Sequence, residues 1–169
     1  MPENSCEVNS NEGATKRVVI PNAILFPEIA KLLEQGHSVS LRLLGGSMRP
    51  FLEDKRDIAV LKLSENYHVG DIVLAQITLT HFVLHRIIAI AQDDITLRGD
   101  GNYGCEYCKI KDIKGIALGF YRKGRTTFES VESRKWKFYA WLWPALFPIR
   151  RYLLFAYRLK LKITNSYKK

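Results

Sequence analysis

The stretch Ser38-Val39-Ser40-Leu41-Arg42-Leu43 alternates polar and apolar residues and leads into Gly45-Gly46-Ser47-Met48-Arg49-Pro50. Alternation with a period of two is typical of a strand that buries one face, and the two glycines after it favour a tight turn. Because glycine has no Cβ, the backbone there can approach another group closely. We therefore expect Ser47 to lie just beyond a strand end, in a turn that can also serve as a site.

Five further segments have strand-like patterns bounded by glycine, aspartate or asparagine: residues 57–63, 72–77, 82–91, 94–98 and 113–121. Before them, residues 22–35 place four apolar side chains at helical spacing, namely Leu25, Ile29, Leu32 and Leu33. Gly36 suits the end of this helix, where φ is often positive. The sequence thus predicts a mainly β fold: a folded antiparallel sheet with one N-terminal helix and a basic, aromatic C-terminal helical tail.

Composition divides the 169 residues into four segments. Residues 1–17 are polar and lack the apolar centre of a secretory signal peptide, so we predict a disordered lead. Residues 18–128 carry the strand patterns and form one β-rich domain. Residues 129–135 are polar and are predicted to be a hinge, and residues 136–169 form the tail.

The formal net charge of +9 is concentrated in that tail. Ten of the 26 lysines and arginines lie between residues 134 and 169, a segment with no aspartate or glutamate, so the rest of the chain is nearly neutral. Basic residues interleaved with tryptophan, tyrosine and phenylalanine favour an anionic membrane surface, and we expect no nucleic-acid partner. The alternative is a helical pair that packs on the β domain or on a partner.

Nothing in the sequence predicts a spanning helix, which needs about 20 consecutive apolar residues. The longest apolar run is interrupted by Pro144 and Pro148. The three cysteines are few and odd in number, which argues against a disulfide framework. We therefore predict a peripheral membrane protein, attached through its tail and otherwise cytoplasmic.

His85 lies inside the apolar pattern 82–88, where an imidazole needs a partner or a cleft. Alternation sends His85 and Arg86 to opposite faces, so only one of them can serve a site at Ser47. A serine hydroxyl is a poor nucleophile without a base, and a neutral imidazole can supply one. Asp100 and Glu106 are the carboxylates that could orient it, although an aspartate before glycine also commonly caps its own turn.

Cys105 and Cys108, together with His81 and His85, are the only cluster that suggests a metal site. Only one Cys-x-x-Cys pair is present, and histidines four residues apart on a strand lie about 13 Å apart, too far to share one ion. We predict neither a metal nor a cofactor.

Four motifs occur in a fixed order: Ser47-Met48-Arg49-Pro50, Gly70-Asp71-Ile72-Val73, His85-Arg86 and Gly99-Asp100-Gly101-Asn102. This order resembles the signal peptidase and LexA-like serine peptidase superfamily, over about residues 38 to 120. Type I signal peptidases carry Ser-Met-x-Pro after a strand, a Gly-Asp strand start, a basic residue followed by arginine, and a Gly-Asp-x-Asn turn. Histidine as the basic residue is similar to the microsomal and archaeal branch.

The resemblance implies a serine endopeptidase that cleaves a leader or signal peptide, or a preprotein, at the membrane surface. Ser47 would be the nucleophile and His85 the general base, which places the peptidase in residues 18–128. In that branch the orienting acid lies a few residues beyond the Gly-Asp-x-Asn turn, so Glu106 rivals Asp100 for this role. Gly45 stands where some members carry a serine that helps the oxyanion hole, so we expect mainly backbone donors, first the N–H of Ser47.

The usual N-terminal anchor of these peptidases has no counterpart in residues 1–17, and we expect the tail to replace it. With His85 as base, activity should fall as the pH drops through about 6 to 7. A self-cleaving regulator is less favoured, since the Ala-Gly and Cys-Gly bonds typical of its cleavage site do not occur. The alternative from another class is a non-catalytic β-module that binds peptides or anionic membranes, with Ser47 and His85 as relics.

Overall fold

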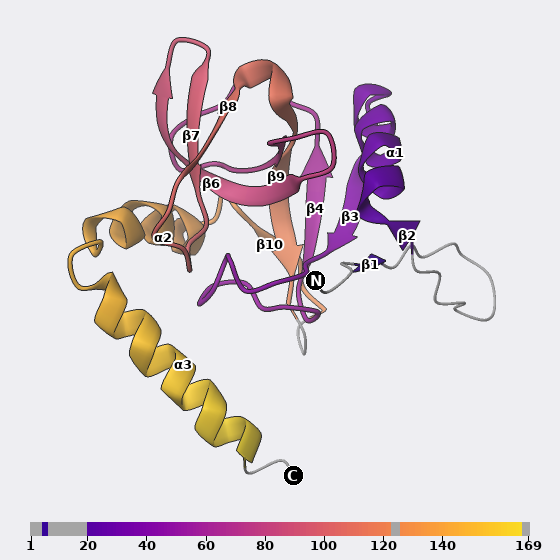
Figure 1. Ribbon diagram of the computed structural model, residues 1–169. Helices are drawn as coiled ribbons and strands as arrows, with labels where there is room; N and C mark the ends of the chain where they lie inside the picture. Colours follow the sequence, from indigo (N-terminus) through magenta and orange to yellow (C-terminus); the bar gives the residue numbers. More distant parts are fainter. Residues whose placement is uncertain (1–4, 7–19, 123–125, 167–169) are drawn as a thin grey trace, which may run out of the picture.

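The computed structural model describes residues 5–6, 20–122 and 126–166. Its main feature is a curled antiparallel sheet with the strand order β3-β4-β9-β5-β6-β7-β8, and β10 pairs with β9 (Figure 1). The strands are β3 (Val39–Arg42), β4 (Ile58–Lys62), β5 (Ile72–Gln76), β6 (Phe82–Ala91), β7 (Asp94–Arg98), β8 (Glu106–Lys109), β9 (Ile113–Tyr121) and β10 (Glu129–Ser130). The predicted mainly β fold with helices at both ends is confirmed.

Within the described residues, three helices accompany the sheet: α1 (Asn22–Glu34), α2 (Arg134–Ala145) and α3 (Arg150–Ser166). A 3-10 turn, η1 (Ile110–Asp112), precedes β9, and β1 (Ser5–Cys6) pairs with β2 (Ile20–Pro21) near the N-terminus. The predicted disordered lead, 1–17, lies almost wholly outside the described residues.

Helix α1 buries a narrower stripe than its sequence predicts. Leu25, Ile29 and Leu33 are buried, whereas Leu32 is 43% exposed. Gly36 ends the helix with a φ of 85°, its N–H donates to the Leu33 carbonyl, and the next amide donates to the carbonyl of Leu32. This pair of hydrogen bonds is a Schellman motif, for which glycine is favoured because it adopts positive φ without strain.

The core divides into two clusters on the two faces of the curled sheet. β5 lies at its centre and buries four consecutive residues from Ile72 to Ala75, because both of its faces are covered. The larger cluster includes Met48 and Leu52, from the loop after β3, and Trp136 from α2. Burial of Met48 and Leu52 anchors the loop that carries Ser47 to the core.

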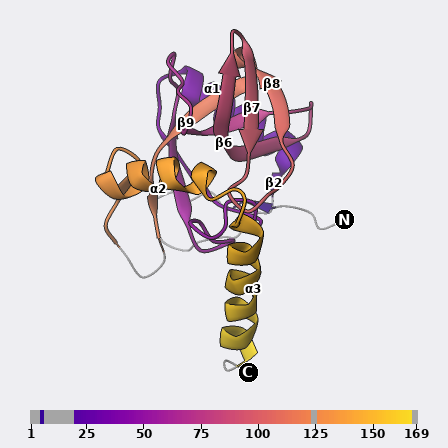
Figure 2. The same cartoon turned by 90° about the vertical axis from the view of Figure 1, so that its left-hand side faces the viewer.

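The C-terminal segment is joined closely to the sheet at its start. Residues 129–135, predicted to be a hinge, begin with β10 and end in the first turn of α2. Trp136, Trp143 and Leu154 are buried, so α2 and the beginning of α3 pack on the β domain. The C-terminal part of α3 extends away from the body (Figure 2). None of the helices in the described part of the chain is long and apolar enough to span a membrane.

Candidate active site

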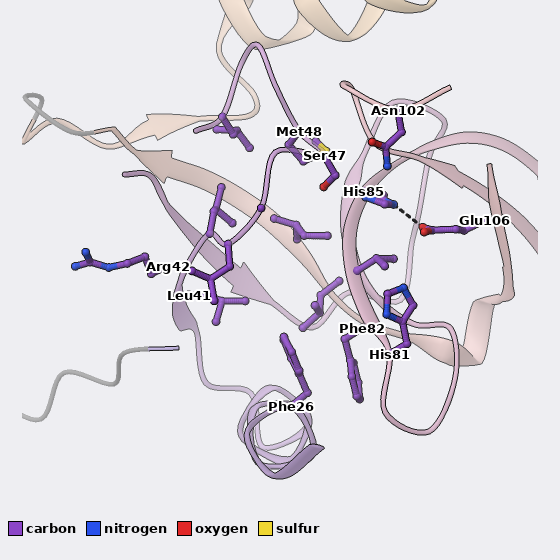
Figure 3. A pocket seen from close by; sticks show the side chains of 17 residues that line it. Phe26, Leu41, Arg42, Ser47, Met48, His81, Phe82, His85, Asn102 and Glu106 are labelled. Atoms are coloured by element: carbon purple, nitrogen blue, oxygen red, sulfur yellow. Dashed lines mark hydrogen bonds and ion pairs between the residues drawn. The ribbon is translucent and has the colours of Figure 1, made fainter. Parts of the chain in front are cut away.

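His85 and Glu106 form the most direct contact at the candidate site. Glu106 begins β8 and His85 lies in β6, and the Nδ1 atom of His85 is 2.5 Å from Oε2 of Glu106 (Figure 3). The His85 side chain is 5% exposed, whereas the Glu106 side chain is 30% exposed. A carboxylate on Nδ1 fixes the ring tautomer and leaves Nε2 as the acceptor, the arrangement that a general base needs.

Asp100 has a different partner. Arg86 donates from Nε to Oδ1 of Asp100 at 2.9 Å and from Nη2 to Oδ2 at 2.7 Å, while its Nη1 donates to the carbonyl of Gly70 at 2.8 Å. Both side chains of this bidentate pair are almost fully buried. As alternation predicts, His85 and Arg86 point to opposite faces of β6, and the two carboxylates are divided between them.

The loop that carries Ser47, residues 45–54, is called the serine loop here. It is held by contacts on both sides. Gly45 has a φ of 89°, and its N–H donates to Oδ1 of Asp54 at 2.8 Å. From the other side, the N–H of Gly101 donates to the carbonyl of Ser47 at 2.6 Å. A Cβ added at Gly99 would lie 2.5 Å from that carbonyl and 3.0 Å from His85 Nε2. The turn 99–102 therefore packs directly between the serine loop and the histidine.

Ser47 and His85 line one pocket of about 290 Å³, together with Asn102 and Glu106. Figure 3 shows these polar side chains gathered at one end, while Phe26 and Phe82 lie at the other. Those two rings stack with centroids 4.6 Å apart. The walls between are mainly apolar, so the pocket combines a small polar cluster with a hydrophobic groove, as ligand sites commonly do.

The pocket lies between two strand edges that have no strand partner in the described part of the chain. β3 pairs with β4 alone, and residues 82–85 of β6 pair only with β5, since the pairing with β7 begins at Arg86. Residues from both edges line the pocket. Unpaired edges of this kind accept an extended peptide by adding backbone hydrogen bonds.

No hydrogen bond joins Ser47 to His85 among the residues drawn in the pocket. Such bonds often form only when substrate is bound, so the missing hydrogen bond is compatible with a catalytic pair. Within the described residues, the N–H of Ser47 and the side-chain amide of Asn102 also make no hydrogen bond. Both donors are therefore available at the polar end of the pocket.

Burial lowers the pKa of His85 below its ordinary value of 6.5, because the protonated ring loses hydration, and the Glu106 carboxylate opposes this effect only in part. The imidazole is therefore neutral at pH 7. A neutral ring can accept a proton at Nε2 while Nδ1–H donates to Glu106.

Cys105, Cys108, His81 and His85 do not come together as a group of potential metal ligands. No group of three or more potential ligands is close enough to hold an ion in the part of the chain that the structure describes. Cys105 and Cys108 are both free thiols, and burial raises the pKa of Cys108 to about 11. His81 instead lines the same pocket as His85 and lies beside Phe82 (Figure 3).

Three residues at the site have no role in the sequence-based prediction: Asn102, Trp143 and Arg150. Trp143 Nε1 donates to the carbonyl of Asp100 at 2.8 Å, and Arg150 donates to carbonyls of the same turn. Asn102 could have been noticed as part of its motif. Arg150 could not, because it is one of ten basic residues in a tail whose charge alone suggests a surface role.

The fold and site thus define a mainly β protein with a serine, a buried histidine and a carboxylate around one pocket. No protein-family model matches the chain, and no curated protein matches it. The resemblance to signal peptidases stays a prediction from the four motifs.

Proposed function

We propose that this protein is a serine endopeptidase, similar to type I signal peptidases, that cleaves a leader or signal peptide at a membrane surface. The observation that carries the proposal is the 2.5 Å contact between His85 and Glu106 in a pocket that Ser47 also lines. In the proposed mechanism Ser47 is the nucleophile, His85 the general base and Glu106 the group that orients the base. Asp100 has a structural role, since its ion pair with Arg86 fixes the turn 99–102 to β6.

The chemistry follows from these roles. Oγ of Ser47 attacks the scissile carbonyl carbon while Nε2 of His85 takes the hydroxyl proton and Glu106 stabilises the imidazolium. The N–H of Ser47 and the amide of Asn102 donate to the oxyanion, in place of the serine that Gly45 replaces. His85 then gives the proton to the leaving amine. Water, activated by the same imidazole, hydrolyses the acyl-enzyme.

The substrate we propose is an extended peptide. It would lie between β3 and the first half of β6, pair with the strand edges that have no strand partner among the described residues, and place apolar or small side chains in the groove. A leader or signal peptide fits this description because its cleavage region is extended and uncharged.

The membrane partner we propose is an anionic surface that contacts the exposed faces of α2 and α3. Trp141 is 68% exposed, Tyr152 72% and Phe155 67%. Tyr152, Phe155, Leu159 and Ile163 recur at helical spacing on α3 and form an exposed stripe, named here the outer stripe. Basic residues flank it, and a basic amphipathic surface of this kind binds anionic lipid.

The test is covalent labelling of the full chain with a fluorophosphonate, with and without anionic vesicles, alongside cleavage of peptides with apolar flanks. We expect labelling that is lost in Ser47→Ala and His85→Ala but retained in Ser40→Ala, whose serine is exposed on β3. The non-catalytic β-module instead predicts peptide or vesicle binding without labelling. Absence of Ser47-dependent labelling and cleavage under every lipid condition would rule out the peptidase.

A further inference from the structure

Helix α3 presents a second face, opposite the outer stripe, to the candidate active site. Arg150, Leu154, Tyr157 and Leu161 recur at positions i, i+4, i+7 and i+11 and so share one side of the helix. Arg150 is 1% exposed and Leu154 2% exposed, and the other two side chains are half-buried. We call this side the inner face. A pocket at the inner face is lined by Ser47 and Asn102 as well as by Leu154 and Tyr157.

At the start of α3, Arg150 binds the backbone of the turn 99–102. Its Nη2 donates to the carbonyls of Gly99 at 2.7 Å and Asn102 at 2.8 Å, and also to that of Asp100. Its guanidinium lies 5.3 Å from the centre of the Trp143 ring. An almost fully buried arginine that binds three carbonyls of one turn fixes the shape of that turn.

The turn transmits this constraint to the serine loop. Its Gly101 N–H is bonded to the carbonyl of Ser47. Any Cβ at Gly101 would meet the carbonyl of Gly46 at 2.8 Å. The contacts therefore form a continuous path from Arg150 through the turn to the backbone of Ser47.

Two turns further along α3, Tyr157 contacts the serine loop by a separate route. Its hydroxyl donates to Oε1 of Glu53, whose other oxygen accepts from Nε of Arg49 at 3.1 Å. The N–H of Glu53 donates in turn to Oδ2 of Asp57 at 2.9 Å. Tyr157 thus holds the segment that follows Ser47, while Arg150 holds the turn that precedes Glu106.

We propose that α3 is a clamp on the active site, and that Arg150 and Tyr157 are positioning residues that hold the turn 99–102 and the serine loop in register. The C-terminal helix is then part of the catalytic apparatus as well as a membrane anchor. For its effect on activity the inference rests on the proposed peptidase function. For its effect on the two loops it does not.

The activity test uses matched variants of the full chain. Arg150→Gln is compared, in the absence of vesicles, with Arg151→Gln, an exposed neighbour with the same charge, and Tyr157→Phe with Tyr121→Phe, an exposed tyrosine at the end of β9. Misplacement of reacting groups by about 1 Å costs roughly 100-fold in rate, so we expect labelling at Ser47 to fall about 10- to 100-fold in Arg150→Gln and several-fold in Tyr157→Phe. Both control variants should label at the wild-type rate. Arg150→Lys should restore part of the rate, because its ammonium still donates to carbonyls.

The structural test is amide hydrogen exchange, measured in the absence of substrate. In Arg150→Gln, exchange should accelerate in residues 99–104 and 45–52 and stay unchanged in α1. If exchange accelerates while even the wild-type chain fails to label, the clamp stands and the peptidase is wrong. Equal labelling and equal exchange in Arg150→Gln and Arg151→Gln would overturn the clamp. Should Arg150→Gln fail to fold, the comparison of Tyr157→Phe with Tyr121→Phe decides by the same two measurements.

Discussion

His85 and Arg86 are adjacent in β6, and each contacts a different carboxylate. One of these carboxylates bears on reactivity and the other on stability. The Glu106 contact leaves a neutral imidazole facing the pocket, whereas the pair of Arg86 and Asp100 is buried and has no exposed edge. In a buried ion pair the attraction between the charges offsets their loss of hydration, so removal of one partner lowers the stability of the fold. Removal of a carboxylate that contacts a pocket histidine should instead lower the rate of the reaction.

This difference can be tested with two amide substitutions. Asp100→Asn leaves the Arg86 guanidinium buried without its countercharge, so the free energy of unfolding should fall by about 3 kcal/mol, measured in urea. Glu106→Gln removes a partly exposed carboxylate and should change that free energy by less than about 1 kcal/mol. It should lower the rate of labelling at Ser47 by roughly 100-fold or more, because the neutral amide no longer stabilises the imidazolium. The reverse pattern would exchange the roles of the two acids.

The pH dependence follows from the burial of His85. Since burial favours the neutral ring and lowers its pKa below 6.5, the base is already available at neutral pH, and activity should be lost only as the pH falls through that lowered value. In Glu106→Gln the opposing effect of the carboxylate is gone, so the acidic limb should move to still lower pH. The measurement is the pH profile of kcat/KM for both proteins. A profile controlled only above about pH 9, where lysine titrates, would identify another base.

At the residue scale the sequence predicts the four site residues but does not decide which carboxylate contacts His85. Ser47, His85 and both carboxylates follow from motifs and strand alternation, and the structure brings His85, Glu106 and Ser47 to one pocket. The choice between Asp100 and Glu106 depends on the path of the hairpin that joins β7 to β8. That path sets which carboxylate faces which side of β6, and no local pattern encodes it.

Among the elements, the turn 99–102 has the tightest packing against the site. Gly99→Ala should displace the Ser47 carbonyl or the His85 ring, since a Cβ there would lie 2.5 Å and 3.0 Å from them. We expect labelling to fall roughly 100-fold. Gly104→Ala is the matched control, because a Cβ at Gly104 has no atom within 4 Å. Equal labelling rates and melting temperatures for the two variants would show that the turn does not position the site.

The elements that the sequence misses are those with weak local patterns. β6, β7 and β9 match their predicted bounds because apolar residues dominate them. β8 was not predicted, since its four residues Glu106 to Lys109 are each at least partly exposed and carry no apolar run. β10 has only two residues and lies in a segment predicted to be a hinge. Both strands form because neighbouring strands of the sheet offer them partners.

At the scale of the whole molecule, the two faces of α3 differ in burial. The outer stripe begins at Tyr152 and the inner face at Arg150, two residues earlier, which corresponds to a rotation of about 200° around the helix. Charge and aromatic content predicted a membrane surface here, with packing on the domain as the alternative. The structure shows packing along the inner face and leaves the outer stripe exposed. The membrane role stays a prediction.

Binding to anionic vesicles tests that role. Phe155→Ser and Leu159→Ser remove apolar side chains from the outer stripe, and each should weaken sedimentation with phosphatidylserine vesicles about tenfold. Leu79→Ser, at a position 88% exposed and far along the chain from the tail, is the control and should bind as wild type does. Binding should also weaken as salt is raised, because the flanking lysines and arginines act through screened charge. Unchanged binding in both stripe variants would remove the membrane from the proposal.

The two faces of α3 have a thermodynamic consequence for the order of events. If a membrane bound to the outer stripe changes how the inner face holds the turn 99–102 and the serine loop, the binding energies of membrane and peptide are linked. Linkage is reciprocal: any factor by which a vesicle tightens peptide binding is the factor by which the peptide tightens vesicle binding. If that factor is greater than one, bound substrate lengthens the time that the protein spends on the membrane, and release of the product shortens it. Each cleavage would then be followed by faster dissociation from the membrane.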